Sequence, residues 1–316
     1  MSSTATHDPG AAFAALRMTM SRWGTEVGPL RHLAAERERL SCLTWQHFDA
    51  RQLGATIGAV IDGLDLTKPL PGPVVAEVRQ ALLDYKVLFF RDQPLTPAQH
   101  VAFAKQFGEL EVHPFIPANG EEPELVRFAK SAQVGGYENS WHSDVSWRER
   151  PSMAAVLHAV EVPATGGDTV FADMCAAYDG LDDATKERID GLSAVHDFML
   201  AFAAQVKPGD MERMRAQYPE VVHPVVRTHG ETGRKLIYVN RTFTDRIVGV
   251  DEDDSTALIG GLSRTAETLE YQCRFSWEPH SVAFWDNRAV QHYACSDYWP
   301  AVRVMERASI IGERPI

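Results

Sequence analysis

The sequence predicts a mainly β protein with helical inserts, built as a double-sheet sandwich or a barrel. Strand-like runs dominate the chain after residue 122, and they do not alternate with helices as the strands of a parallel α/β sheet do. Turn-forming residues separate neighbouring runs, as in HGETGRK at residues 229–235. Two helical patterns interrupt the strands, at about residues 173–192 and 251–270.

The first 45 residues differ from the rest of the chain. Their helical stretches are cut by GTEVGPL at residues 24–30, and their apolar stripe is narrow. We therefore expect an N-terminal extension over residues 1–45, partly ordered or helical, followed by one folded domain over residues 46–316. The extension is also a candidate for an oligomer contact.

The folded domain is expected to begin with strands and helices in turn. ATIGAVIDGLDL at residues 55–66 has a strand-and-turn pattern with well-spaced glycines. Residues 72–86 are amphipathic at helical spacing, and the apolar strand 87–92 follows. Residues 96–108 predict a second helix, which begins with a threonine N-cap and a proline and ends at a glycine.

The remaining strands are expected where β-branched and apolar runs are bounded by turn residues. An acidic cluster at residues 251–254 precedes the second helical insert, and it more simply complements the helix start than binds a metal. The predicted strands are PELVRFA, MAAVLHAVEV, DTVFAD, VVHPVVRTH, KLIYVN, YQCRFSW, SVAFWDN and VRVMERASIIG.

Composition narrows the classes of partner. The chain has 31 Lys and Arg against 43 Asp and Glu, a formal charge of −12, which argues against broad binding to nucleic acid. No apolar run is long enough to cross a membrane, and the first residues lack the pattern of a signal peptide. The four scattered cysteines suit a reducing cytosol. We expect a cytoplasmic protein, a homo-oligomer by the common default for such enzymes.

The stretch SWHSDVSW, residues 140–147, is a candidate for half of a metal site. In an extended backbone, side chains alternate between faces, so His142 and Asp144 would point the same way and Ser143 away. Both groups can bind a metal, and tryptophans flank them on either side. The alternative is a pair of polar residues on the wet side of a strand.

A third ligand would have to come from elsewhere in the chain. Among the twelve histidines, His292 is a candidate because it follows a predicted strand in the polar, aromatic segment FWDNRAVQHYACSDYWP, which we expect to be a loop. Two histidines and one carboxylate form the facial triad of non-haem Fe(II) oxygenases. By itself this combination is weak evidence, since many chains contain it by chance.

A strand near the C-terminus adds two cations. Alternation in VRVMERASIIG places Arg303 and Arg307 on one face, about 13 Å apart at ~3.3 Å per residue. Two arginines on an otherwise apolar strand are costly unless anions meet them, and their planar groups suit carboxylates or sulfonates. The alternative is an outer face with ordinary ion pairs.

Several long motifs resemble the taurine dioxygenase (TauD/TfdA) family over roughly residues 50–316. They are WHSD, PATGGDTVFADM, VHPVVRTHGETGRKLIYVNRTFTDRIVGV and WDNRAVQHYACSDYWPAVRVMERASIIGERP, in this order. The resemblance implies a double-stranded β-helix, or jelly roll. It also implies an enzyme that uses Fe(II) with 2-oxoglutarate and O2 as co-substrates.

The resemblance also implies roles for individual residues. His142, Asp144 and His292 match the iron ligands, which are also the catalytic centre of the family. Thr169 and Arg303 match the pair that holds the distal carboxylate of 2-oxoglutarate. The positions that match substrate contacts are Arg307, His113, Phe202 and Phe243.

Two departures from the taurine enzymes bear on the substrate. Ile116 stands where those enzymes have a tyrosine, which removes a phenol from the sulfonate site. Glu138 stands where they have an asparagine, four residues before the first iron histidine. A carboxylate there would repel a second acid and attract an ammonium, although Glu138 is at least as well explained by solvation or a structural ion pair. Taurine itself is therefore doubtful.

The predicted function is hydroxylation of a small anionic organic molecule, with release of succinate and CO2. Candidates are a sulfonate, an alkyl sulfate ester or a carboxylate. An alternative is a biosynthetic hydroxylase that acts on an amino-acid-like intermediate with the same cofactors. A zinc hydrolase would use the same triad but leaves Thr169 and Arg303 unexplained. A non-catalytic metabolite sensor is a further alternative, and the intact triad argues against it.

Overall fold

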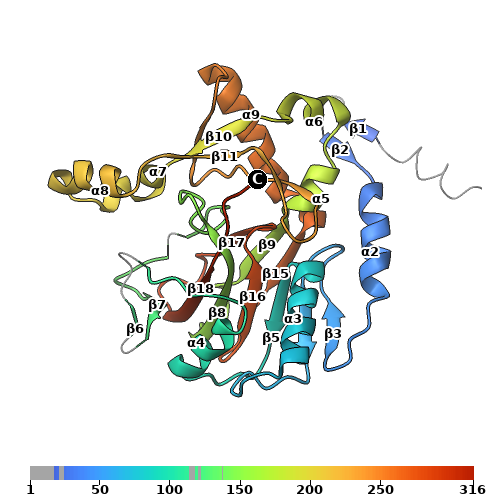
Figure 1. The fold of residues 1–316 in the computed structure, drawn as a ribbon, viewed down its shortest axis with the longest axis vertical. Coiled ribbons are helices and arrows are strands. Elements are labelled where there is room, and N and C mark those ends of the chain that lie inside the picture. Colours follow the sequence, from blue (N-terminus) through green and yellow to red (C-terminus); the bar gives the residue numbers. More distant parts are fainter. Residues whose placement is uncertain (1–17, 21–24, 114–117, 120–121, 137) are drawn as a thin grey trace, which may run out of the picture.

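A large sheet forms the centre of the fold, as Figure 1 shows. The computed structural model describes residues 18–20, 25–113, 118–119, 122–136 and 138–316. Neighbouring strands of the large sheet run antiparallel, except that β4 and β5 are parallel. In spatial order these strands are β3 (Asp49–Gln52), β4 (Ala59–Asp62), β5 (Val87–Phe90), β16 (Val282–Asp286), β8 (Ser152–Glu161), β18 (Arg303–Ile311), β7 (Glu122–Lys130) and β6 (Ala118–Asn119).

A three-stranded antiparallel sheet faces the large one. Its strands, in order, are β15 (Gln272–Phe275), β9 (Thr169–Asp173) and β17 (Val290–Ala294). Aromatic rings fill the space between the two sheets. Phe89 of β5 stacks on Phe275 of β15 with ring centroids 4.0 Å apart. Phe171 of β9 lies 5.6 Å from Trp285 of β16. The two sheets therefore share one apolar core.

Two helices, α3 (Gly72–Tyr85) and α4 (Pro97–Lys105), cover the other face of the large sheet. Side chains of β16 alternate between the two cores: Phe284 packs with the helices and Trp285 with the small sheet. Burial on both faces explains why these strands read as continuous apolar runs. As predicted, α4 begins at a threonine: Thr96 and Gln99 form a capping box.

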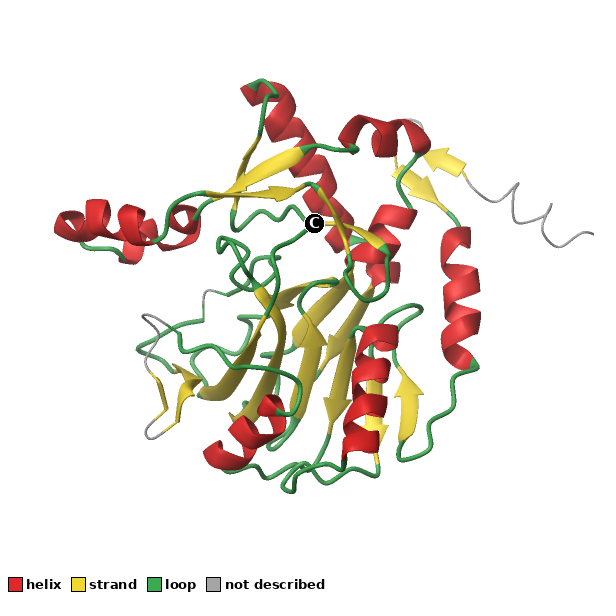
Figure 2. Cartoon of the chain, viewed as in Figure 1, coloured by secondary structure: helices red, strands yellow, loops and turns green. Residues whose placement is uncertain are grey.

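The remaining elements surround these layers, and in Figure 2 most of the helices lie at the periphery, around the central strands. β10 (Ser193–His196) lies between β11 (Val221–Pro224) and β14 (Thr244–Ile247), and β12 (Val226–Thr228) pairs with β13 (Lys235–Ile237). β1 (Met18–Met20) pairs with β2 (Thr25–Val27). The other helices are α2 (Ala34–Ser41), α5 (Met174–Asp179), α6 (Asp183–Ile189), α7 (Phe198–Phe202), α8 (Met211–Gln217) and α9 (Glu252–Arg264).

The prediction of a mainly β chain with helical inserts is confirmed, and two local predictions are wrong. His292 lies within strand β17 and not in a loop. Residues 140–147 do not form a strand: His142 makes one bridge and a turn follows at Asp144. The acidic cluster does complement its helix, since Asp251 is the N-cap of α9 and accepts from the backbone N–H of Asp254.

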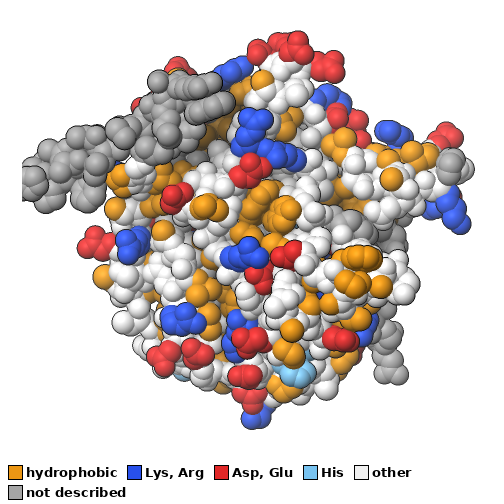
Figure 3. All heavy atoms as spheres, turned by 180° about the vertical axis from the view of Figure 1, so that it is seen from behind, with side chains coloured by type: hydrophobic (Ala, Val, Ile, Leu, Met, Phe, Trp, Pro, Cys, Tyr) orange, Lys and Arg blue, Asp and Glu red, His pale blue; other side chains and the backbone are white. Residues whose placement is uncertain are grey.

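Part of the predicted N-terminal extension packs on the body. Leu33 and Leu40 are buried in the two cores, and Arg39 forms an ion pair with Asp84 at 2.7 Å. The boundary at residue 45 therefore stays a prediction. Among the described residues, no helix is long and apolar enough to cross a membrane. On the face shown in Figure 3, basic and acidic side chains are interspersed.

Candidate active site

Two histidines meet at the edge of the small sheet. The backbone N–H of His142 donates to the carbonyl of His292 at 3.1 Å, and the N–H of His292 donates to the carbonyl of His142 at 2.8 Å. Residues paired in this way carry their side chains on the same side. The two imidazole centroids accordingly lie 4.3 Å apart. The backbone pairing therefore brings together residues that are 150 positions apart in the sequence.

Asp144 completes the group from the turn that follows His142. Its Oδ1 lies 3.7 Å from Nε2 of His142 and 3.9 Å from Nε2 of His292. Asn287 fixes this turn: its Oδ1 accepts from the N–H of Asp144 at 2.7 Å, and its Nδ2 donates to the carbonyl of Asp144 at 3.0 Å. We did not predict this role for Asn287. The available signal was a buried amide directly after the apolar strand β16.

Two of the three side chains, Asp144 and His292, have the protonation states that a metal requires. Burial raises the pKa of Asp144, but the positive charge of Arg307 outweighs burial, together with the electrostatic influence of the two histidines and the hydrogen bond from Arg307, and holds that pKa below its usual value. Burial, helped by the proximity of His142, lowers the pKa of His292 to about 3. At neutral pH the carboxylate is therefore ionised and this imidazole is neutral, as metal ligands must be.

The hydrogen bonds leave suitable donor atoms free for a divalent cation. Nδ1 of His142 lies 2.7 Å from the carbonyl of Ser140, so Nδ1 carries the proton and Nε2 keeps its lone pair. Oδ2 of Asp144 is buried without a hydrogen-bond partner among the described residues. One ligand atom from each of the three side chains lies within 4.8 Å of the others. This donor set fits Fe(II).

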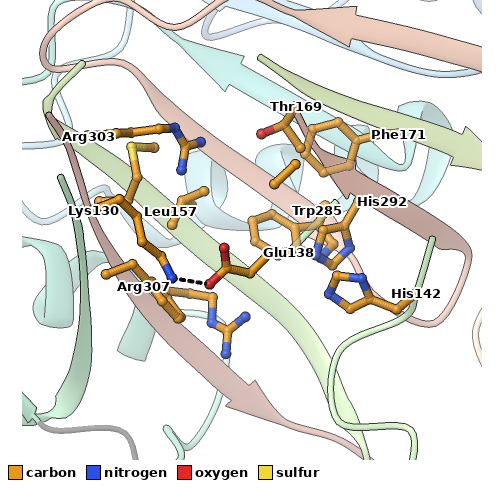
Figure 4. Close-up of a pocket in the computed structure, with 13 residues that line it drawn as sticks. Lys130, Glu138, His142, Leu157, Thr169, Phe171, Trp285, His292, Arg303 and Arg307 are labelled. Carbon is orange, nitrogen blue, oxygen red and sulfur yellow. Dashed lines mark ion pairs between the residues drawn. The ribbon is translucent and has the colours of Figure 1, made fainter. Parts of the chain in front are cut away.

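A cavity of about 80 Å³ extends from the two histidines to Arg303, as Figure 4 shows. Nε of Arg303 donates to the carbonyl of Gly167 at 3.2 Å, whereas its Nη2 is buried with no partner among the described residues. A Cβ at Gly167 would lie 3.1 Å from Cδ of Arg303, so the glycine gives the arginine room. The cavity is lined by Phe128, Lys130, Glu138, His142, Leu157, Thr169, Phe171, Trp285, His292, Ala294, Arg303, Met305 and Arg307.

The prediction that Arg303 and Arg307 share a face agrees with the structure, since both line the cavity. Nη1 of Arg307 pairs with Oδ1 of Asp144 at 2.7 Å, while its Nε is buried without a hydrogen-bond partner among the described residues. Thr169 lines the same cavity, and its Oγ1 accepts from Nε1 of Trp277 at 3.0 Å. Each arginine therefore keeps one N–H group available for an anion.

Glu138 lines the cavity but is not alone there. Its Oε1 lies 2.6 Å from Nζ of Lys130, an ion pair drawn in Figure 4. Lys130 stands opposite Arg303 in the pairing of β7 with β18. We did not predict Lys130, although a charged residue at the end of the strand PELVRFA was a signal. The structural ion pair that we considered for Glu138 is thus present.

The other predicted substrate residues lie at different distances from the triad. The ring of Phe243 is 6.1 Å from that of His142, and Phe202 is 6.2 Å from Phe243, one layer farther out. Burial, then the charges of Arg307 and Arg148, lower the pKa of His113 to about 3, so His113 is neutral at neutral pH. Ile116 lies outside the described residues.

Comparison with known proteins decides the family. Residues 49–309 match the model of the taurine catabolism dioxygenase TauD, TfdA family. The chain belongs to this family. It is similar to an alpha-ketoglutarate-dependent sulfate ester dioxygenase from Pseudomonas putida, with 37% identity over 276 residues that cover 85% of this chain and 91% of the relative.

Other relatives agree with this assignment. An alpha-ketoglutarate-dependent 2,4-dichlorophenoxyacetate dioxygenase from Cupriavidus pinatubonensis is 32% identical, covering 84% of this chain and 98% of that protein. A solved taurine dioxygenase from Burkholderia xenovorans is 37% identical with a TM-score of 0.75, covering 86% and 91% of the two chains. The predicted family is confirmed, and the chain is a 2-oxoglutarate-dependent dioxygenase of the non-haem iron type.

Proposed function

We propose that this dioxygenase hydroxylates a small anionic organic molecule, such as an alkyl sulfate ester, a sulfonate or a carboxylate. The observation that supports the proposal is one cavity with a His–Asp–His group at one end, an arginine beside that group and a second arginine at the far end. The relatives compared above are named for sulfate esters, taurine and 2,4-dichlorophenoxyacetate, which all contain an anionic group.

We infer that the two facing sheets are the two halves of a jelly roll. Antiparallel pairing of β16, β8 and β18 in one sheet, and of β15, β9 and β17 in the other, supports this inference. Strands from both halves would then supply the site: β17 supplies His292, β9 supplies Thr169 and β18 supplies both arginines. A rigid scaffold of this kind holds functional groups more precisely than loops do.

His142, Asp144 and His292 would hold Fe(II), and Thr169 and Arg303 would bind the distal carboxylate of 2-oxoglutarate. Iron and the co-substrate, once bound, supply the activation of O2 and the oxidation of a C–H bond, with succinate and CO2 as co-products. The contribution of the protein is to hold the metal and the co-substrate in position. The free Nη2 of Arg303 gives a charge-assisted hydrogen bond to the carboxylate, and its carbonyl partner Gly167 holds the guanidinium in place.

Arg307 would bind the anionic group of the substrate. In its present position one N–H group is paired with Asp144 and Nε has no hydrogen-bond partner within the described part of the chain, so the guanidinium can bind the carboxylate and an incoming anion together. That arrangement would place the substrate beside the triad, with His113 and Phe243 as further contacts and Phe202 behind them. Apolar walls at Phe128 and Leu157 exclude water from the same space.

Glu138 would shape the substrate site through its pair with Lys130. The two charges cancel, so the pair neither repels an anion strongly nor leaves a bare carboxylate to attract an ammonium. This favours an anionic substrate without an amino group over a taurine-like zwitterion. The biosynthetic hydroxylation of an amino-acid-like intermediate is the alternative, and a free Glu138 would have favoured it.

A succinate-release assay over a panel of substrates tests the proposal. The panel contains sulfonates, alkyl sulfate esters, aryloxyalkanoates and amino acids, each beside a neutral analogue in which an alcohol replaces the anionic group. We expect substrate-dependent succinate with at least one anionic compound and much less with its neutral analogue. Equal turnover of both, or turnover of amino acids alone, would contradict the proposal. The product mass separates cleavage from a stable hydroxylated product.

Two further predictions concern the state of the protein in the cell. We infer a cytoplasmic enzyme, because all four cysteines are free thiols and none needs an oxidising compartment. We also retain the prediction of a homo-oligomer from the common behaviour of such enzymes. Analytical ultracentrifugation of the purified chain measures the second, and a monomer across the micromolar range would contradict it.

A further inference from the structure

The geometry points to a second divalent-metal site, on the face of the large sheet that is opposite the catalytic cavity. We propose that His100, His158 and Glu306 bind a zinc-like cation between helix α4 and strands β8 and β18. Among the described residues, this group and the catalytic triad are the two sets of three potential ligands whose atoms lie within 4.8 Å of one another. The inference does not depend on the proposed substrate.

Strand register brings two of the ligands together. Glu306 of β18 is directly opposite His158 of β8, and directly opposite residues carry their side chains on the same face of a sheet. That face is the one covered by α4, because the next residues along each strand, Leu157 and Arg307, line the catalytic cavity instead. α4 packs across both strands and supplies His100.

The hydrogen bonding of His100 is that of a metal ligand. Its Nε2 lies 3.0 Å from the carbonyl of Val156 and so carries the proton, which leaves the lone pair on Nδ1. Nδ1 is buried and has no hydrogen-bond partner among the described residues. A histidine that donates one N–H to a backbone carbonyl and offers the other nitrogen is the usual arrangement in metal sites.

His158 gives independent support. It is 2% exposed, and neither of its ring nitrogens makes a well-formed hydrogen bond within the described part of the chain, although the backbone of Gln93 lies near enough to raise its pKa. A buried imidazole with no partner is unfavourable, because water has been removed from its nitrogens and nothing replaces it. A cation bound to one nitrogen removes this cost. Burial is the main cause that lowers the pKa of His100 to about 3 and of His158 to about 4, and a neighbouring histidine ring adds to each shift, so both rings are neutral.

The carboxylate and the surroundings suit a cation as well. Glu306 is 3% exposed, and one of its oxygens pairs with Arg127, whose side chain is 40% exposed. That arginine can turn toward solvent when a metal takes its place. The ring of the exposed His280 lies 5.9 Å from that of His158, so the group is one ring away from the surface. This provides a path for entry of the ion.

Ligand chemistry selects the metal class. Two imidazoles and one carboxylate fit zinc and neighbouring first-row cations rather than calcium or magnesium, which prefer oxygen ligands. Tetrahedral bonds of about 2.0–2.2 Å place ligand atoms about 3.4 Å apart. The three ligand atoms now lie within 4.8 Å of one another, so binding requires these side chains to move closer by up to about 1.4 Å. A metal here would join α4 to β8 and β18 directly behind Arg307, and we expect it to stabilise the fold.

The experiment counts metal in a protein whose catalytic site has been removed. The variant His142→Ala/His292→Ala, prepared without a histidine tag and stripped with a chelator, is dialysed against Zn²⁺, and bound zinc is measured by mass spectrometry. We expect about one equivalent per chain and a rise in the melting temperature. Glu306→Gln, and separately His158→Gln, in the same background should lose both the bound zinc and the rise in melting temperature. His280→Gln is the matched control and should keep both.

Each other outcome overturns the proposal. No zinc in the triad-free variant rules out the site, and zinc that persists in Glu306→Gln or His158→Gln shows binding elsewhere on the chain. If the triad-free variant does not fold, the wild-type chain answers the question: two equivalents of zinc support the second site and one equivalent contradicts it. Circular dichroism reports the folding of every variant.

Discussion

Similar groups of potential metal ligands lie on the two sides of strand β18, in different surroundings. On one face, His142, Asp144 and His292 lie at the end of a cavity that two arginines also line, each with an N–H group that has no partner among the described residues. On the other face, Glu306 lies with two histidines beneath α4. On the cavity side, two histidines and a carboxylate adjoin a space lined by anion-binding groups, and oxygenase chemistry needs both of these in addition to metal ligands.

The largest difference between the two sides of β18 should appear in the turnover of 2-oxoglutarate. His142→Ala removes a proposed iron ligand, and we expect 2-oxoglutarate turnover to fall by more than the roughly 10- to 100-fold that is typical for residues that only support a ligand. Substrate-dependent succinate formation measures this effect. His280→Ala, on the opposite face and exposed, should retain wild-type turnover. Equal losses in both variants would mean that the two faces are not functionally distinct.

Asn287 tests how the triad is held. Asn287→Ala removes the two hydrogen bonds to the backbone of Asp144, and we expect affinity for Fe(II) or Mn(II) to fall by about 10- to 100-fold. Backbone groups left without partners should also lower the free energy of unfolding by about 1–3 kcal/mol. Metal titration and urea unfolding measure the two effects. A loss of stability with unchanged metal affinity would assign Asn287 a purely structural role.

The two arginines on the cavity face should have separate effects. Charge-assisted hydrogen bonds contribute about 1.5–3 kcal/mol, so Arg303→Ala should raise the KM for 2-oxoglutarate by about 10- to 100-fold. Arg307→Ala should instead raise the KM for the organic substrate, and it also leaves Asp144 without its partner. Steady-state kinetics with each compound varied in turn measures this. A shift of the same KM in both variants would contradict the assignment.

His196 sharpens the comparison because it is as buried as the ligand histidines but belongs to neither group. Burial, then the charge of His223, lower its pKa from 6.5 to about 3. The unfolded chain therefore binds a proton that the folded chain does not, and stability falls as the pH drops from 6.5 toward 3. This contribution is about 1.4 kcal/mol per pH unit.

Urea unfolding of the wild type and of His196→Gln between pH 7 and pH 4 measures the contribution of His196. The slope of stability against pH should be smaller in the variant by about that amount over the range from pH 6 to pH 4. At pH 7 and above, the pH-dependent part of the difference should vanish. Parallel curves over the whole range would show that His196 is protonated equally in the folded and unfolded chains.

Much of the fold was predictable because the strands are buried on both faces. Runs such as MAAVLHAVEV and SVAFWDN are continuous and apolar, so their type and bounds could be predicted. The segment after Asp286 was harder. His292 lies in β17 among polar and aromatic residues, and its strand exists because it pairs with β9, which sequence periodicity does not reveal.

The site was predictable to the extent that its residues lie in motifs. The arginine spacing on β18 followed from alternation, and the proposed iron ligands followed from the family resemblance. Lys130 and Asn287 were missed because their roles depend on tertiary contacts. Lys130 pairs with Glu138, and Asn287 joins its own turn to the turn at Asp144. The turn at Asp144 likewise replaces the expected strand, yet it brings the carboxylate to the histidines.

Anaerobic titration with Fe(II) and 2-oxoglutarate tests the central claim most directly. If His142, Asp144 and His292 hold iron while Arg303 binds the co-substrate, the wild-type chain should develop a weak visible charge-transfer band at about one equivalent of each. His142→Ala should show no band. Absence of the band in the folded wild type, or its persistence in His142→Ala, would contradict the account.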